Sequence, residues 1–194
     1  MRKGQNTNHP KPGAEIKVEP IRSARDIKAI KRLLADNPRD YALFILGINT
    51  NLRASDLLTL RVEQVRGIVA GQDIELKEQK TSKKRRITLN KGCVDAIQAL
   101  LSQRDSEPLF SGQRGPLTVP SVNRLVKQWC SQVNLKGNYG SHTLRKTWGY
   151  HQRVTFGRGT AELMVCFNHS TERQTLDYLC VQPEEIKSIY MNEL

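Results

Sequence analysis

The sequence predicts an α+β fold that is mainly helical and carries one small antiparallel β-hairpin. Most of the chain repeats apolar residues at the three- and four-residue spacing of amphipathic helices. This spacing is interrupted after Gly67, where short segments rich in β-branched residues flank a basic turn. At 194 residues the chain can bury a substantial core but is short for two full domains. We therefore expect one helical domain with a small sheet.

Three helices are expected in the first part of the chain. Ser23 and Asp26 form a capping box, and an apolar stripe follows them. Pro38 is expected to begin a second helix, which is apolar nearly all round and should be the central buried helix. It should end near Asn49. Ser55 is expected to be the N-cap of a third, short helix.

Short strands are expected at residues 68–69, 74–77 and 87–89. The last two flank a hairpin tip that carries five basic residues, Lys80, Lys83, Lys84, Arg85 and Arg86. A hairpin can hold one such lysine in a defined place while the other charges lie along a phosphate backbone. A basic run at a turn can also be a solvated loop, but the basic composition of this chain favours contact with DNA.

The next part of the chain is expected to contain a helix, a loop and a second helix. An amphipathic helix is predicted over residues 94–101, and a loop over residues 102–120. Ser121 is expected to be the N-cap of the helix that follows. Arg124 and Lys127 point away from the apolar face of that helix, so both could contact a phosphate backbone.

The stretch that ends at Tyr178 holds the residues best suited to chemistry. Ser141 is a good N-cap, so His142 and Arg145, three residues apart, should point from one face of the first helical turn. His169 falls in a polar break between two apolar helical runs, and the helix after it carries Tyr178. These side chains suit chemistry on a phosphate, because a helix N-terminus also attracts anions.

The composition indicates a polyanionic partner. The formal net charge is +12 at pH 7, and Lys and Arg contacts to phosphates release counterions, so nucleic acid is the first candidate. A merely basic, soluble protein is the alternative. The four cysteines form no Cys-x-x-Cys pair, so we expect reduced, mostly buried thiols and no metal site.

The ends of the chain differ from its middle. Residues 1–20 are polar, basic and rich in proline, so we expect a flexible basic tail, either an arm that touches the DNA backbone or an inert leader. Residues 21–181 should form the folded domain. Residues 182–194 should form a C-terminal helix that could dock onto a neighbouring protomer. No apolar run reaches membrane-spanning length and no hydrophobic leader precedes the domain, so we expect a cytoplasmic, DNA-associated protein.

One more pair of residues belongs with those near Tyr178. Arg53 falls on the turn before the third helix, where its guanidinium can reach a cleft, and Asp56 could hold it there. An ordinary surface ion pair is the alternative. In order and spacing, the motifs of this chain resemble the catalytic domain of the tyrosine recombinases, the phage integrase family. The resemblance covers about Ser23 to Leu179 and rests on Arg53 within Leu52–Leu57, Lys80-Thr81, His142-Thr143-Leu144-Arg145, and His169-Ser170 with Tyr178 nine residues later.

The sequence departs from the family pattern at three points. Asn168 stands where the family usually has glycine, and a left-handed backbone there would suit Asn better than most residues. Lys146 replaces the histidine that often follows the second arginine. Most members carry a helical DNA-clamping domain before the catalytic domain, so both a small complete member and one domain of a longer protein remain open.

The resemblance implies an enzyme that cuts and rejoins double-stranded DNA at specific sites through a 3′-phosphotyrosyl intermediate, without cofactor, ATP or metal. Tyr178 would be the nucleophile. Arg53 and Arg145 would bind the scissile phosphate, because the guanidinium fork matches phosphate geometry. His142 would assist the proton transfer, and His169 would donate a hydrogen bond to a phosphate oxygen.

The resemblance also assigns a hairpin lysine to protonation of the leaving 5′-oxygen. Lys80 matches best because it directly precedes Thr81, and Lys83 and Lys84 remain alternatives. Two duplexes must be held together in such a reaction, which implies a homo-tetramer on DNA. A non-catalytic DNA-binding regulator on the same fold is the alternative function.

Overall fold

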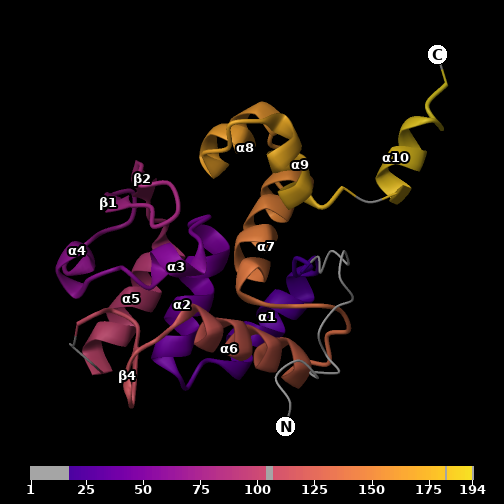
Figure 1. The fold of residues 1–194 in the computed structure, drawn as a ribbon. Helices are drawn as coiled ribbons and strands as arrows, with labels where there is room; N and C mark the ends of the chain where they lie inside the picture. The colour runs from indigo at the N-terminus through magenta and orange to yellow at the C-terminus, as the bar shows by residue number, and fades with distance from the viewer. Residues whose placement is uncertain (1–17, 104–106, 182, 194) are drawn as a thin grey trace, which may run out of the picture.

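The computed structural model describes residues 18–103, 107–181 and 183–193 (Figure 1). Its helices are α1 (Ala24–Leu33), α2 (Pro38–Asn49), α3 (Ala54–Leu57), α4 (Val62–Val65), α5 (Lys91–Gln103), α6 (Val119–Gln132), α7 (Ser141–Val154), α8 (Thr160–Phe167), α9 (Glu172–Leu179) and α10 (Pro183–Ile189). Its strands form two antiparallel pairs, β1 (Asp73–Lys77) with β2 (Lys84–Thr88), and β3 (Ser111–Gly112) with β4 (Gly115–Pro116). The predicted fold class, mainly helical with a small antiparallel sheet, is confirmed.

Helix α2 is the centre of the main core. It begins at Pro38 as predicted, and its residues 42–47 are all buried. It packs against α5 and α7. A Cβ atom added at Gly47 would lie 2.5 Å from Leu144 Cδ1, so glycine lets α2 and α7 approach closely. This close crossing brings the end of α2, and the α3 segment after it, next to the first turn of α7.

Helix α7 links the main core to a second, smaller one. Figure 1 shows α8 and α9 at the end of α7 that lies away from α2 and α6, with α10 projecting beyond them. The second core consists of Leu163, Phe167 and Leu179, with Trp148 and Tyr178 packed against it. Residues of α8 and α9 are therefore held by this small core, next to the main core but separate from it.

The strand predictions were partly right. Two of the three predicted strands are present, as β1 and β2. The prediction of a strand at Ile68 and Val69 was wrong: Ile68 N–H donates back into the α4 turn. Gly67 and Gly71 on either side adopt φ of 70° and 88°, which interrupts extended backbone. The predicted loop over residues 102–120 also contains β3 and β4.

Three serines predicted as N-caps lie inside their helices. Ser55 is the second residue of α3, whose N-cap is Arg53 in extended conformation. Ser121 lies in the first turn of α6, where its N–H donates to the Oγ1 of the N-cap Thr118 (3.3 Å). Ser141 is the first residue of α7. Serine suits several positions near a helix start, so residue type alone locates an N-cap only to within about three residues here.

The chain that leads into α1 is attached to the connection between α6 and α7. Residues 1–17 of the predicted tail lie outside the described residues. Glu19 N–H donates to the Asn138 carbonyl (2.8 Å), and the buried Ile21 donates its N–H to Thr147 Oγ1 (2.8 Å). Among the helices that the structure describes, none is long and apolar enough to cross a bilayer.

All four cysteines are free thiols. Cys93 and Cys130 are buried, and burial raises the pKa of each thiol to about 12. Cys166 is exposed and Cys180 is partly exposed, so the prediction of buried thiols holds for two of the four. Within the described ranges, no group of three or more His, Cys, Asp or Glu side chains is arranged to hold a metal ion.

Candidate active site

An open pocket of about 530 Å³ lies where the start of α3, the β1–β2 turn, the start of α7 and the α8–α9 connection meet. Five of the six side chains predicted to be catalytic line it: Arg53, Lys80, His142, His169 and Tyr178. The sixth, Arg145, is buried next to the ring of Tyr178. Segments up to 125 residues apart in the chain thus meet around one cavity, since Arg53 and Tyr178 both line it.

Arg145 is a buried cation with unused hydrogen-bonding capacity. Only 1% of the residue is exposed, and its Nη2 donates to the Phe167 carbonyl (2.8 Å). Its Nε and Nη1 have no hydrogen-bond partner among the described residues. Burial, and then the charges of Arg53 and Arg85, lower the pKa of this guanidinium to about 9. An anion in contact with Arg145 would relieve both the missing hydrogen bonds and the repulsion.

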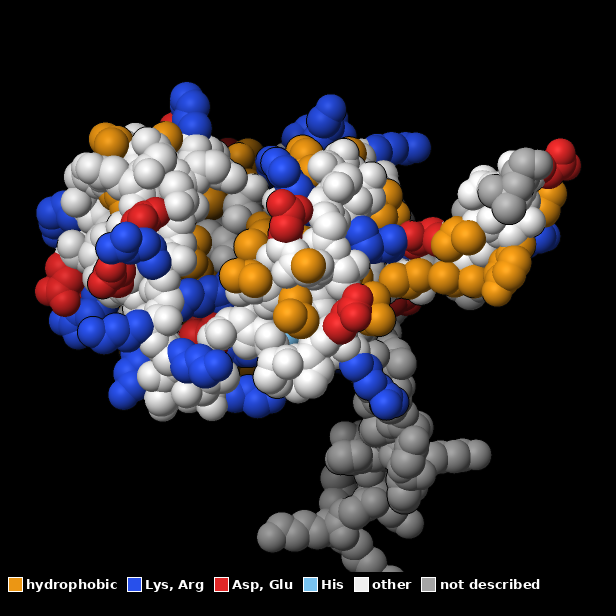
Figure 2. Space-filling model, turned by 90° about the horizontal axis from the view of Figure 1, so that it is seen from above, with side chains coloured by type: hydrophobic (Ala, Val, Ile, Leu, Met, Phe, Trp, Pro, Cys, Tyr) orange, Lys and Arg blue, Asp and Glu red, His pale blue; other side chains and the backbone are white. Residues whose placement is uncertain are grey.

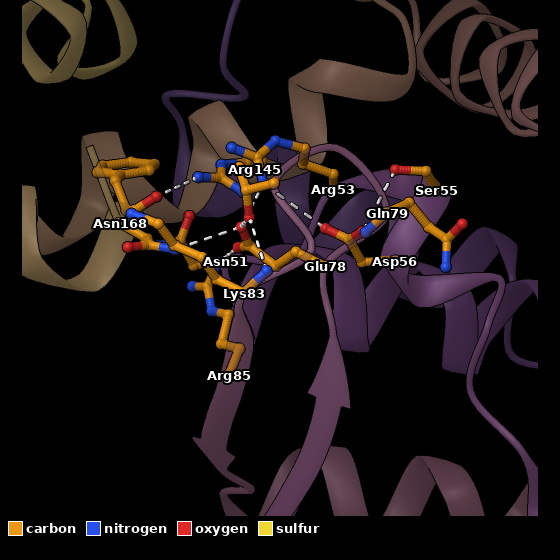
Figure 3. Close-up of polar contacts among 12 residues, drawn as sticks. Asn51, Arg53, Ser55, Asp56, Glu78, Gln79, Lys83, Arg85, Arg145 and Asn168 are labelled. Carbon is orange, nitrogen blue, oxygen red and sulfur yellow. Dashed lines mark hydrogen bonds and ion pairs between the residues drawn. The ribbon is translucent and has the colours of Figure 1, made fainter. Parts of the chain in front are cut away.

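Arg53 lies beside Arg145 and is held by two carboxylates (Figure 3). Its Nη1 lies 3.1 Å from Glu78 Oε2 and 3.7 Å from Asp56 Oδ2. Asp56 is fully buried, and its Oδ1 accepts the backbone N–H of Gln79 (2.9 Å). The pair is therefore not an ordinary surface ion pair: Asp56 joins the start of α3 to the hairpin and supports Arg53.

Tyr178 lies between the two histidines. Its Oη is 3.3 Å from His142 Nδ1, which is within reach of a hydrogen bond. Its ring centroid lies 5.2 Å from that of His169, which in turn is stacked on Phe167 at 5.0 Å. His169 Nδ1 lies 3.2 Å from Thr175 Oγ1, and this contact sets the direction of the imidazole. The phenol therefore has a proton acceptor next to it.

Local backbone features place His169 and Tyr178. Helix α8 ends at Asn168, which adopts the left-handed conformation (φ 56°), as the sequence led us to expect. The chain then turns into α9, whose N-cap is Thr171: its side chain accepts the N–H of Gln174 (3.4 Å). Thr171 therefore fixes where the helix that carries Tyr178 begins.

Both histidines of the pocket are neutral at physiological pH in the protein without ligand. Burial, and then the charges of Arg145 and Arg53, lower the pKa of His169 from 6.5 to about 4. The same causes, in the same order, lower the pKa of His142. A neutral imidazole can accept a proton from a phenol that lies next to it.

We expect the free energy of unfolding to fall as the pH drops from about 6.5 to about 4, because His169 has the lower pKa in the folded state. Between these two pH values His169 binds a proton in the unfolded chain but not in the folded protein. Titration of ¹³C-labelled histidines by NMR should give a midpoint near 4 for His169, and near 6.5 for the urea-unfolded chain. A midpoint near 6.5 in the folded protein would contradict the proposed burial among cations.

The structure narrows the choice of hairpin lysine. Lys80 and Lys83 both line the pocket, whereas Lys84 does not: together with Lys83 it borders a neighbouring cavity. Lys80 is exposed and follows directly after Gln79, whose N–H is bound to Asp56. Lys80 therefore projects from a part of the turn that is anchored to the Arg53 segment.

The remaining predicted DNA-binding residues fall into two groups. Lys83, Lys84, Arg124 and Lys127 are exposed, as contact with DNA requires. Arg86 is also exposed, although it forms ion pairs with acidic residues on β1. Arg85 is different: its side chain is only 10% exposed, and its contact with DNA stays a prediction. It lies inward because Glu78 Oε1 and the Cys166 carbonyl accept its hydrogen bonds (2.8 and 2.7 Å).

Two residues near the pocket were missed from the sequence. Glu78 is buried and binds Arg53 and Arg85. Its position continues the alternation of buried residues along β1, after Ile74 and Leu76, so the two-residue period of a strand could have placed it inside. Lys146 is also buried, and its Nζ lies 5.9 Å from the centroid of the Tyr178 ring. Its position directly after Arg145 was the signal in the sequence that could have placed it near the pocket.

The pocket brings a phenol together with two imidazoles and two guanidinium groups, in a mainly helical fold that carries the β1–β2 hairpin. This combination of site and fold defines a class of protein, the tyrosine-type site-specific recombinases. The model of the phage integrase family matches residues 24–185, and the chain belongs to this family.

Named relatives agree with this assignment. The chain is 35% identical over 179 residues to a probable integrase/recombinase, YoeC, of Bacillus subtilis (strain 168), a match that covers 89% of this chain and 95% of that protein. Among solved structures, XerA recombinase has a TM-score of 0.73 and 18% identity, covering 98% of this chain and 68% of that one. XerH recombinase bound to its difH substrate after cleavage has a TM-score of 0.71 and 19% identity, covering 87% of this chain and 51% of that one. At these identities the two structures show the shared fold.

Proposed function

We propose that this recombinase cuts and rejoins double-stranded DNA through a 3′-phosphotyrosyl intermediate on Tyr178, without ATP or metal. The observation that carries the proposal is the position of Tyr178 Oη, 3.3 Å from His142 Nδ1, in the pocket that Arg53 and His169 also line. One phosphoester replaces another in this reaction. The bond energy is therefore conserved, and no external source is needed for rejoining.

The bond changes follow from the arrangement of the side chains. His142 accepts the phenolic proton as Tyr178 Oη attacks phosphorus, and the bond from phosphorus to the 5′-oxygen breaks. The leaving 5′-oxygen takes a proton from Lys80, which lines the same pocket. Rejoining is the reverse: the 5′-hydroxyl attacks phosphorus, and Tyr178 leaves and recovers its proton.

The charge that develops on the phosphoryl oxygens meets three donors. Arg145 offers its buried Nε and Nη1, which have no partner among the described residues. Arg53 offers a guanidinium that forms ion pairs with the carboxylates of Asp56 and Glu78. His169 donates a hydrogen bond to one oxygen. Such preorganised donors are the largest usual source of rate acceleration in a site of this kind.

Contact with DNA is proposed for the exposed basic residues around the pocket. Lys83, Lys84 and Arg86 on the hairpin, and Arg124 and Lys127 on α6, would lie along the phosphate backbone. The net charge of +12 supports this, as does the prevalence of Lys and Arg over acidic side chains in Figure 2. The related XerH structure contains bound difH DNA.

The proposal is tested with a duplex that carries a candidate target site and a nick beside the scissile phosphate. The nick lets the short 5′-hydroxyl fragment diffuse away, so any covalent complex accumulates and is seen on a denaturing gel. Mass spectrometry of the digested adduct should place the nucleotide on Tyr178. A shift of the DNA on a native gel, with no covalent species under any condition, would instead favour a non-catalytic DNA-binding regulator.

We also propose that the protein acts as a homo-tetramer on DNA, with α10 docked onto a neighbouring protomer. Ile186, Ile189, Tyr190 and Met191 are exposed, and Figure 2 shows hydrophobic side chains along the projecting arm. Glu185 at the start of α10 forms an ion pair with Arg153 of α7, which fixes where the arm begins. A helix with an exposed apolar face is covered in an assembly at lower free energy than in water.

For this surface we expect Ile189→Asp to weaken the assembly that pairs two DNA duplexes, because it puts a charge into an apolar interface. Cleavage at a single site should be nearly unchanged, because the site lies within one chain. Analytical ultracentrifugation of the DNA complex measures the first, and the covalent-complex assay measures the second. Lys187→Ala, also exposed on α10, is the control. Equal assembly by both variants would contradict docking through α10.

A further inference from the structure

We propose that Glu78 is a positioning residue for the recombination reaction: its buried carboxylate holds together the three segments that carry Arg53, Lys80 and His169. This inference rests on the proposed function. Glu78 lies just after β1 and is absent from the pocket lining, so it acts on the reaction through its neighbours.

Glu78 is 1% exposed and its carboxylate is fully used. Oε2 accepts the hydroxyl of Thr81 (2.6 Å), lies 3.1 Å from Arg53 Nη1, and accepts the Nδ2 of Asn168 (3.4 Å). Oε1 accepts Nη1 of Arg85 (2.8 Å). Figure 3 shows Arg53, Arg85 and Asn168 around this carboxylate, from the α3 segment, the hairpin and the end of α8.

Of the partners of Glu78, Arg53 has a proposed role itself, and Thr81 and Asn168 are each adjacent in sequence to a residue with a proposed role. Thr81 follows Lys80 in the hairpin turn, so the 2.6 Å hydrogen bond limits where the lysine can lie. Asn168 precedes His169, so its contact with Glu78 limits the turn between α8 and α9. Arg53 is contacted directly. One side chain thus positions the proposed general acid and two proposed phosphate-binding groups.

A second connection from Glu78 reaches the end of α8. Arg85, bound to Glu78, also donates through Nη2 to the Cys166 carbonyl (2.7 Å), which accepts Asn51 Nδ2 as well (2.8 Å). The next carbonyl, that of Phe167, accepts the hydrogen bond of Arg145 described above. The last turn of α8 is therefore anchored to the hairpin and to the α2–α3 connection, and these bonds carry the influence of Glu78 toward His169.

Charge explains why the residue is a carboxylate. The charges of Arg53 and Arg85 both act on Arg145, and the Glu78 carboxylate forms ion pairs with Arg53 and Arg85. Burial alone would raise the pKa of Glu78, but the hydrogen bonds of Thr81 and Arg85 and the charge of Arg53 lower it to about 2. Glu78 is therefore ionised at every working pH. It keeps the cations together until a phosphate arrives.

Replacing Glu78 by glutamine tests the role of the charge. The amide keeps the size of the side chain but turns an N–H donor toward guanidinium donors, so Arg53 and the turn with Lys80 should shift. A misplacement of about 1 Å typically lowers a rate by about 100-fold, and we expect a loss of that size in covalent-complex formation on the nicked duplex. Glu78→Asp, which keeps the charge, should recover part of the rate.

Glu75 offers a matched control on the same strand. It is also a glutamate paired with an arginine, with its Oε1 2.8 Å from Arg86 Nη2, but both side chains are about two-thirds exposed. Glu75→Gln should therefore cleave at the wild-type rate. If Glu78→Gln and Glu75→Gln both cleave like the wild type, the proposal is overturned.

A modified substrate shows whether slower cleavage by Glu78→Gln comes from a displaced Lys80 or from a smaller amount of folded protein. Sulfur in place of the bridging 5′-oxygen gives a thiolate leaving group, which is a weak base and leaves without a proton. A displaced Lys80 then matters less, so the ratio of the cleavage rates of the sulfur and oxygen substrates should rise at least about tenfold in Glu78→Gln. A fall in folded protein would lower both rates equally and leave the ratio unchanged.

Thr81→Val keeps the test valid if Glu78→Gln fails to fold. It removes the hydroxyl bound to Glu78 with almost no change of shape, and it should also raise the ratio. If neither variant raises the ratio, Glu78 has no positioning role. Failure of the proposed function looks different: wild-type protein would then form no covalent complex with either substrate, and both proposals would fall together.

Discussion

Tyr178→Phe is expected to abolish the covalent protein–DNA complex while leaving DNA affinity within about twofold of the wild type. The change removes only the hydroxyl that attacks phosphorus. The ring keeps its contacts with Phe167 and His169, whose centroids lie 5.3 and 5.2 Å away. The lost hydrogen bond to His142 should lower the free energy of unfolding by about 0.5–1 kcal/mol. A denaturing gel measures the first effect, and a native-gel titration measures the affinity.

Tyr190→Phe is the control for this experiment. Tyr190 is 84% exposed beyond α10 and should tolerate loss of its hydroxyl without effect on cleavage. A covalent complex that persists in Tyr178→Phe would mean that another side chain is the nucleophile, and the assignment of the pocket would then be wrong. Loss of DNA binding together with loss of the complex would show that the hydroxyl is needed for binding, and the missing complex would then be no evidence that Tyr178 is the nucleophile.

Arg145→Met is expected to produce opposite effects on activity and stability. Removal of one preorganised donor to a developing charge lowers a rate by about 10²–10³-fold, and Arg145 offers two nitrogens, Nε and Nη1, that have no partner among the described residues. Stability should increase, because the folded protein currently holds a buried cation whose nearest charged neighbours include other cations. Replacement of buried charges by apolar side chains of similar volume stabilises proteins by about 1–4 kcal/mol, and we expect the low end of that range.

The pH dependence of the free energy of unfolding also indicates that the charge of Arg145 destabilises the folded protein. The pKa of Arg145 is about 9 in the folded protein, below its ordinary value, so the folded state binds this proton more weakly than the unfolded chain does. The resulting destabilisation is fully present below pH 9 and is relieved as the pH rises above it. Urea unfolding at pH 7 should therefore show a higher midpoint for Arg145→Met than for the wild type.

An exposed arginine provides the comparison for Arg145. Arg32→Met in the last turn of α1 should change the free energy of unfolding by no more than about 0.5 kcal/mol and should leave cleavage intact. A lower urea midpoint for Arg145→Met would show that the hydrogen bond to Phe167 and the two ring contacts outweigh the desolvation of the charge. Wild-type cleavage by Arg145→Met would remove Arg145 from the proposed mechanism.

The sequence predicted the major elements because their signals are local. The apolar run after Pro38 is buried wherever it packs, and two segments with β-branched residues on either side of a short turn pair with each other. The prediction at Ile68 was wrong for a related reason: a strand needs a partner, and two flanking glycines with positive φ leave none within reach. The predicted cap at Ser23 is confirmed, whereas those at Ser55, Ser121 and Ser141 were shifted by one to three residues, since several residues near a helix start can satisfy its free N–H groups.

The candidate site was predictable in its residue types but not in its support. Arg53, Lys80, His142, His169 and Tyr178 were recognised by their order, and all five line one pocket. Arg85 shows the limit of that approach. As part of a basic run it was predicted to contact DNA, but in the folded chain it lies inward against Glu78.

The sequence by itself determined the identity and order of the reactive groups, the central buried helix and the hairpin, because these depend on residues close together in the chain. Only the tertiary structure decided which of those groups are charged, which are neutral and which are held in place. Those properties depend on burial and on charges from distant segments: Glu78 meets Asn168, 90 residues away, and Tyr178 meets His142 across 36 residues. Such contacts join segments that are far apart in the chain, and no periodicity within one segment encodes them.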